Sequence, residues 1–161
     1  MLVTSQLVSQ EAHRRGMTII EIVITLSLIA IITALGLVAL NPGGQLAGAR
    51  NSQRSLHLTG IMNGIRQNMA ETSGGGFTCA AGTIPATTTK MAVGGGNYDI
   101  GPCLTPTYLP VLPFDPKTAS AHFNSVTDYD TGYTIVRNAS TGVVTLAAPS
   151  AEQGKTITLA R

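Results

Sequence analysis

The chain has 161 residues, which is enough for one modest domain with appendages. Ten Lys and Arg against eight Asp and Glu give a formal net charge of +2, too weak a balance to indicate a nucleic-acid-binding protein. Only 11% of residues are charged, against about a quarter in an average soluble domain, so Ser, Thr, Asn and Gly must solvate much of the surface. Such a surface is more typical of an exported protein than of a cytosolic enzyme.

The first predicted element is an apolar helix. Residues Met17 to Leu40 form a predominantly apolar run whose single charged member is Glu21. As a helix this run would be about 36 Å long, enough to cross the roughly 30 Å hydrocarbon layer of a membrane. The alternatives are a buried core helix and a secretory signal peptide. A small domain has little core in which to hide such a helix, and a signal peptide has a shorter apolar stretch before its cleavage site.

Two charged features accompany this run. Arg14 and Arg15 precede it, which places that end in the cytoplasm and the rest of the chain outside. Glu21 lies inside it, where a carboxylate costs on the order of 3 kcal/mol at the membrane centre and is functional by default. If the chain is cut after Gly16, Met17 supplies an α-amino group that can pair with Glu21 of a neighbouring subunit. The alternative is an interfacial Glu21 that stays at the headgroups or is protonated.

The segment Arg15-Gly16-Met17-Thr18-Ile19-Ile20-Glu21, followed by the apolar run, resembles the class III leader of type IV pilins and pseudopilins. The resemblance implies that residues 1–16 are a prepilin leader and that a membrane-embedded prepilin peptidase cuts after Gly16. It also implies that the same enzyme methylates the amino group of Met17, and that Glu21 is the carboxylate used in assembly. Met17 departs from the family pattern, in which Phe usually begins the mature chain.

The resemblance further implies a location and a set of partners. Residues 17–40 would be the transmembrane and assembly helix of a single-pass precursor in the cytoplasmic membrane, with its N-terminus in the cytoplasm. The processed subunit would then join an extracellular or periplasmic filament. Its partners would be other copies of itself, the prepilin peptidase, and the assembly machinery of a pilus or of a type II secretion system. Many pilins carry a helix-kinking Pro where this chain has Val38, and the nearby proline is Pro42.

Residues 41–70 are predicted to continue the helix as an amphipathic segment. Its apolar stripe, spaced at i, i+3, i+4, i+7 and i+11, predicts the core of a globular head: Leu58, Ile61, Met62, Ile65 and Met69. Pro42, Gly43 and Gly44 favour a melted or stretched helix at the start of the segment. Arg50, Arg54 and Arg66 are expected to be polar members of the helix, and His57 to face solvent.

Residues 71–161 are predicted to form the head, with a loop region over 71–130 and a β-sheet over 131–161. The loop contains at most one short strand, and the sheet is expected to contain Thr131–Arg137, Gly142–Ala147 and Lys155–Ala160. The fold class is therefore α+β, with a long N-terminal helix packed on a small C-terminal antiparallel sheet. In an exported protein, Cys79 and Cys103 are expected to form a disulfide, which would contribute about 3 to 4 kcal/mol.

The residue types of an enzyme active site are not gathered in any motif, so the predicted protein is not an enzyme. Asp115, Asp128 and Asp130 precede the predicted sheet, and the resemblance to type II secretion pseudopilins implies a possible calcium site there. The alternative is that these carboxylates solvate or cap turns. No other cofactor is expected. The sequence thus predicts a structural subunit of a type IV pilus-like filament, and the alternative is an uncleaved, signal-anchored extracytoplasmic binding protein.

Overall fold

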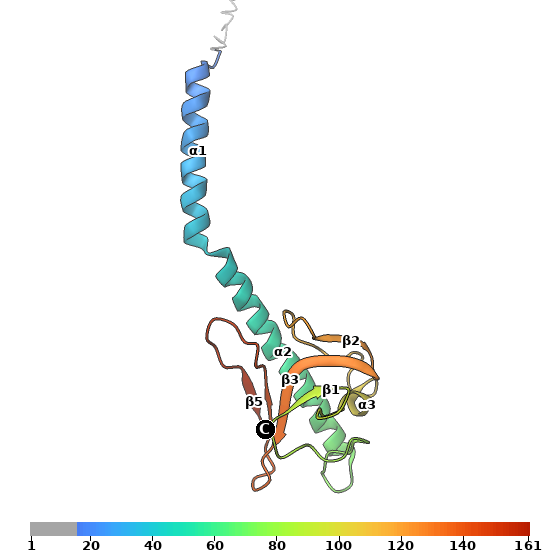
Figure 1. The fold of residues 1–161 in the computed structure, drawn as a ribbon. Helices are drawn as coiled ribbons and strands as arrows, with labels where there is room; N and C mark the ends of the chain where they lie inside the picture. The colour runs from blue at the N-terminus through green and yellow to red at the C-terminus, as the bar shows by residue number, and fades with distance from the viewer. Residues whose placement is uncertain (1–15) are drawn as a thin grey trace, which may run out of the picture. The chain divides into compact units, whose positions relative to one another are not determined.

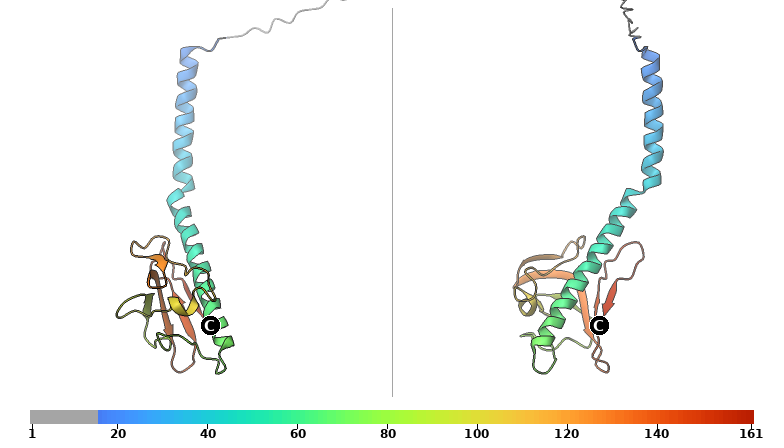
Figure 2. Two further views of the ribbon diagram at one scale, coloured as in Figure 1. Left: turned by 90° about the vertical axis from the view of Figure 1, so that its right-hand side faces the viewer. Right: turned by 180° about the vertical axis from the view of Figure 1, so that it is seen from behind.

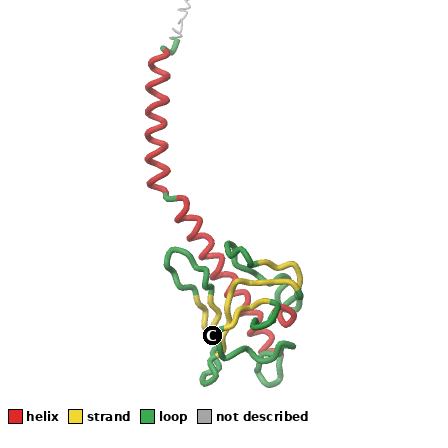
Figure 3. The backbone as a smooth tube through the Cα atoms, viewed as in Figure 1, coloured by secondary structure: helices red, strands yellow, loops and turns green. Residues whose placement is uncertain are grey.

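The computed structural model describes residues 16–161. The predicted leader residues 1–15, Arg14 and Arg15 among them, lie outside the described residues. The chain divides at Pro42 into two compact units, each of which is described here by itself. Helices, strands and loops are distinguished by colour in Figure 3.

The first unit contains helix α1, Ile19–Leu40. Thr18 caps its N-terminus, and Asn41 ends it in the left-handed conformation, with φ of 39°. Pro42 then opens helix α2, Pro42–Glu71, at the first helical position, where proline lacks no needed hydrogen bond. The sequence leaves open whether the helix is continuous through Pro42, Gly43 and Gly44, although their chemistry favours melting or stretching there. These residues are helical, and the interruption is confined to Asn41 because an Asn tolerates the left-handed region.

The second unit is built by packing α2 on one face of a sheet (Figures 1 and 2). The predicted apolar stripe is confirmed: Leu58, Ile61, Met62 and Ile65 are at most 1% exposed, and Met69 packs against their edge. From the sheet and its connections, the core receives the buried side chains Met91, Ile100, Leu104, Leu112, Tyr133, Ile135, Val144 and Leu146. The fold is α+β, as the sequence predicts.

The sheet is antiparallel throughout and is organised around its longest strand, β3 (Asp128–Arg137). Its order is β1-β3-β4-β5, and β2 also pairs with β3. The other strands are β1 (Thr89–Ala92), β2 (His122–Ser125), β4 (Val144–Ala147) and β5 (Thr158–Ala160). Buried Tyr133 and Ile135 alternate along β3 and direct one face of the strand toward α2.

The head differs from the prediction mainly before residue 131. The segment predicted as a loop over 71–130 contains β1, β2 and the short helix α3 (Gly101–Leu104), and β3 itself begins at Asp128. The remaining two predicted strands are confirmed with shorter bounds. The expected disulfide is present and joins Cys79 in the loop to Cys103 in α3, with a Cα–Cα distance of 5.2 Å.

Candidate functional site

Helix α1 exposes every one of its side chains within the described chain. Its large aliphatic residues are between 43% and 84% exposed, and one charged residue, Glu21, interrupts them. The helix is long and apolar enough to span a membrane, and it is the only helix in residues 16–161 with these properties. A surface of this size is not stable in water, so lipid or other protein must cover it.

The predicted processing residues lie immediately before α1. Gly16 and Met17 precede the first helical turn and are exposed, so the peptide bond between them is in open chain. An accessible, non-helical bond is what a peptidase needs in order to bind its substrate in an extended form. Glu21 follows within the first turn of the helix.

Thr18 gives Glu21 a local role that the sequence reasoning missed. The Thr18 Oγ1 atom accepts a hydrogen bond from the Glu21 N–H at 3.3 Å. Thr18 and Glu21 thus stand at the N-cap and N3 positions of the Thr-x-x-Glu pattern, and a carboxylate in the first turn also faces the positive end of the helix dipole. The Glu21 carboxylate has no hydrogen-bond or ion-pair partner among residues 16–161, so it remains available to an external cation.

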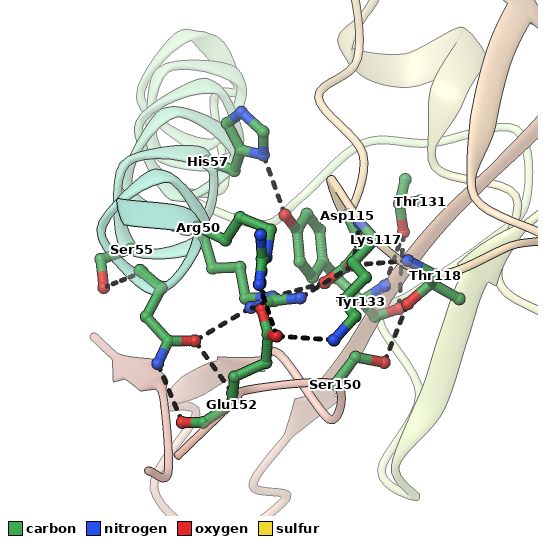
Figure 4. A network of polar contacts seen from close by, with 12 residues as sticks. Arg50, Ser55, His57, Asp115, Lys117, Thr118, Thr131, Tyr133, Ser150 and Glu152 are labelled. Atoms are coloured by element: carbon green, nitrogen blue, oxygen red, sulfur yellow. Dashed lines mark hydrogen bonds and ion pairs between the residues drawn. The ribbon is translucent and has the colours of Figure 1, made fainter. Parts of the chain in front are cut away.

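In the head, an ion-pair network fixes α2 to two loops (Figure 4). Arg54 is fully buried, and its guanidinium donates to both carboxylate oxygens of Asp115, at 2.7 and 3.1 Å. Arg54 also donates to Glu152 at 3.1 Å, and Glu152 receives further bonds from Arg50 and Lys117. Three cationic side chains therefore share two carboxylates.

Backbone and amide contacts complete the network. Asn51 on α2 donates to the carbonyl of Glu152 at 2.9 Å and accepts from its N–H at 3.0 Å. The Asp115 carboxylate accepts from the N–H groups of Lys117 and Thr118, both at 2.9 Å. Because these bonds reach from α2 to the 115–118 turn and to the loop around Glu152, they define how the helix sits on the head.

The charges in this network perturb its acidic groups strongly. Burial raises the pKa of Asp115, but the hydrogen bonds from Arg54 and from the Lys117 and Thr118 N–H groups outweigh it and hold the pKa at about 2. Hydrogen bonds from Arg50 and Lys117 hold the pKa of Glu152 well below its usual range. Both carboxylates are therefore ionised at any physiological pH.

The prediction that His57 faces solvent is wrong. Its Nδ1 atom lies 2.8 Å from the Tyr133 hydroxyl, and the two rings meet edge to face. Burial lowers the pKa of His57, which favours the neutral imidazole. The sequence carried a signal for this position, because His57 lies one residue before Leu58 and four before Ile61 of the apolar stripe.

The structure does not gather Asp115, Asp128 and Asp130 around one point. Asp115 is committed to Arg54, Asp130 pairs with Lys90, and exposed Asp128 bonds to His122 at 3.0 Å and to Asn124. Among residues 16–161 there is no group of three His, Cys, Asp or Glu side chains arranged to hold a metal ion. The three carboxylates instead cap turns and neutralise cations, which was the alternative interpretation of their spacing.

Comparison of the chain with protein-family models, with curated proteins and with solved structures found no match.

Proposed function

We propose that this chain is a structural subunit of a type IV pilus-like filament. In this proposal the precursor is inserted in the cytoplasmic membrane, cut after Gly16, methylated on Met17 and polymerised through α1. One observation carries the proposal: α1 buries none of its side chains within the described chain, and its single charge is an unpaired carboxylate in the first turn. The head closes its own core with α2 and therefore does not need α1 for packing.

The geometry around Gly16 supports the processing step. Cleavage of the exposed Gly16–Met17 bond leaves an α-amino group two residues before α1 and four residues before Glu21. In one helix this amino group lies near the Glu21 of its own subunit. When a second helix is shifted along the axis, the same amino group can reach the Glu21 of its neighbour. Opposite charges in an apolar surrounding attract strongly, so this pair favours one axial register over others.

The experiment that tests the processing is the N-terminal mass of the protein isolated from its native membrane or surface fraction. We expect a chain that begins at α-N-methylated Met17. We also expect Gly16→Leu to accumulate as the longer precursor in the membrane, because a bulky side chain occupies the position before the cut. Gly36→Leu, in the middle of α1, is the matched control and should be processed normally.

The role of Glu21 requires a second measurement. A Glu21→Gln subunit should be inserted and processed, but it should be cross-linked into multimers at least tenfold less than the unchanged chain. Ser27→Ala, which removes a hydroxyl that bonds only within α1, is the control and should assemble normally. Assembly of Glu21→Gln at the unchanged level would remove the pairing from the proposal.

One observation favours a second candidate, the uncleaved signal-anchored extracytoplasmic protein. The Glu21 carboxylate lies in the first turn of α1, where the positive end of the helix dipole stabilises it without a partner subunit. This candidate expects a chain that still contains the leader and a Glu21→Gln variant without an assembly defect. The mass measurement separates the two candidates.

A further inference from the structure

Two arginines flank Val144 in the sheet, on the face that is directed toward α2. Arg137 at the end of β3 is the register partner of Val144 in β4. Val144 in turn exchanges two backbone hydrogen bonds with Arg161, at 2.8 and 2.9 Å. Directly paired residues of antiparallel strands project to the same face, and neighbouring strands are about 4.8 Å apart. Arg137 and Arg161 are therefore anchored about 10 Å apart, with the buried side chain of Val144 between them.

The space in front of this row is a groove between the sheet and the last turns of α2. One part of it, about 310 Å³ in volume, is lined by Val144 and Arg161 from the sheet side and by Arg66 from the helix. An adjoining part, about 250 Å³ in volume, is lined by Arg137. The two parts share Met69 and Val144. The lining of the two parts is mainly apolar, and Thr83 and Thr141 are its uncharged polar side chains. Its further apolar side chains are Met62, Ile65, Phe77, Ile84 and Val143.

The three arginines around this groove have no acidic partner within the part of the chain that the structure describes. Every other arginine or lysine in residues 16–161 is ion-paired, except Lys155 on a loop away from the groove. Unpaired cations thus converge from α2, β3 and the end of the sheet on one apolar surface. Like charges held this close repel one another, and an anionic ligand would relieve the repulsion.

We propose that this groove, the Arg66–Arg137–Arg161 groove, binds an extended acidic segment of a partner protein. In that segment, two carboxylates flank an apolar side chain. The side chains of an extended peptide alternate between two faces, so residues i, i+2 and i+4 project to the same side. Carboxylates at i and i+4 are about 13 Å apart, and the flexible side chains of Arg137 and Arg161, anchored about 10 Å apart, can reach both. The apolar side chain midway between them occupies the floor at Val144 and Met69, and the guanidinium forks of Arg137 and Arg161 each pair with one carboxylate.

The arrangement fits other anions less well. A single-chain lipid carries one anionic end, which leaves two of the three arginines unpaired. A nucleic acid offers phosphates at close intervals, but it presents no aliphatic group for the floor formed by Met62, Ile65 and Val144. The site belongs entirely to the head, so it does not depend on whether α1 enters a filament or remains an anchor.

The test uses the full-length chain in non-ionic detergent and a fluorescent dodecapeptide with two aspartates four residues apart and a leucine midway between them, so that all three side chains share one face of the extended peptide. Binding is followed by fluorescence anisotropy at low salt. We expect saturable binding, with each of Arg137→Gln and Arg161→Gln weakening it roughly twofold to fivefold, the upper part of the range for an ion pair at an exposed site. Replacing both aspartates of the peptide by asparagine should weaken binding at least tenfold. Replacing its leucine by serine should weaken binding measurably as well.

Lys155→Gln is the matched control, because it removes an unpaired cation outside the groove, and it should leave binding unchanged. Equal weakening by Lys155→Gln would overturn the proposal, since it would indicate general attraction to a basic surface. Equally tight binding of an oligonucleotide or of anionic lipid vesicles would overturn it in favour of another anion. If the chain itself dimerises and the Arg137→Gln, Arg161→Gln double variant is monomeric, the occupant is a second copy rather than a partner segment.

Discussion

Asp115→Asn removes the carboxylate charge that faces buried Arg54 while it keeps nearly the same side-chain shape. Arg54 would then remain at 0% exposure with only Glu152, at 3.1 Å, to balance its charge. Removing one partner of a buried ion pair costs about 3 to 5 kcal/mol. Because Glu152 stays in place, we expect a loss of about 3 kcal/mol in the free energy of unfolding, at the lower end of that range.

The pKa of Asp115 leads to a similar magnitude. A decrease from the ordinary value of 3.8 to about 2 in the folded state corresponds to roughly 2 kcal/mol of stabilisation by ionised Asp115. A group whose folded pKa is depressed contributes its full stabilisation above the unfolded pKa and loses it as the pH falls through the folded value. The difference between the unchanged chain and Asp115→Asn should therefore be constant above about pH 5 and shrink between about pH 4 and pH 2.

The assay is urea unfolding of the disulfide-intact, full-length chain in non-ionic detergent. The near-UV circular dichroism of the tyrosines reports on the head, since the chain has no Trp and three of its four Tyr are buried there. Asp128→Asn is the matched control. Its carboxylate is 61% exposed and pairs with exposed His122, so its loss should cost far less than the loss of the Asp115 carboxylate. Equal losses for the two variants, or a difference that persists unchanged to pH 2, would refute the reasoning.

Two further changes test the core of the head with the same assay. Replacing Cys79 and Cys103 together by Ser should lower the free energy of unfolding by about 3 to 4 kcal/mol, and a reducing agent should lower that of the unchanged chain by a similar amount without affecting the variant. Gly101→Ala should cost about 1 to 3 kcal/mol, because the new Cβ would lie 2.5 Å from the Tyr129 ring. Gly48→Ala, whose Cβ meets open space in α2, should instead stabilise the chain by about 1 kcal/mol or less, and an equal effect of the two alanines would contradict the packing argument.

Much of the fold was predictable because periodic patterns carry it. The stripe from Leu58 to Met69 predicts the buried face of α2, and the β-rich run Thr131–Arg137 predicts most of β3. Strand β2 was missed, and β1 was expected only as one short strand without a position, because each has only four residues and neither shows alternation that can be recognised in isolation. Both segments are strands because they pair with β3, so tertiary contacts rather than local sequence determine their secondary structure.

The ion-pair network was less predictable for a different reason. Arg54 lies in phase with Leu58 and Ile61, at the spacing of the apolar stripe, yet an arginine is expected at the surface unless its partner is known. The partners, Asp115 and Glu152, are 61 and 98 residues away in the sequence. No local pattern links them, and the sequence offered turn capping or calcium binding as the role of Asp115, not a buried arginine. A buried charge is recognised from sequence only when its counter-ion is also identified.

The division of the chain bears on how assembly would be driven under the proposed function. The core of the head is closed by α2, so α1 is free to exchange one apolar surrounding for another. Lipid tails are as apolar as leucine side chains, and the transfer of α1 from a membrane to a bundle of identical helices gains little from the hydrophobic effect. The group whose surroundings differ most between the two states is the Glu21 carboxylate. The specificity of assembly must then come from Glu21 and from contacts between heads, and for this reason Glu21→Gln should affect assembly while it leaves membrane insertion intact.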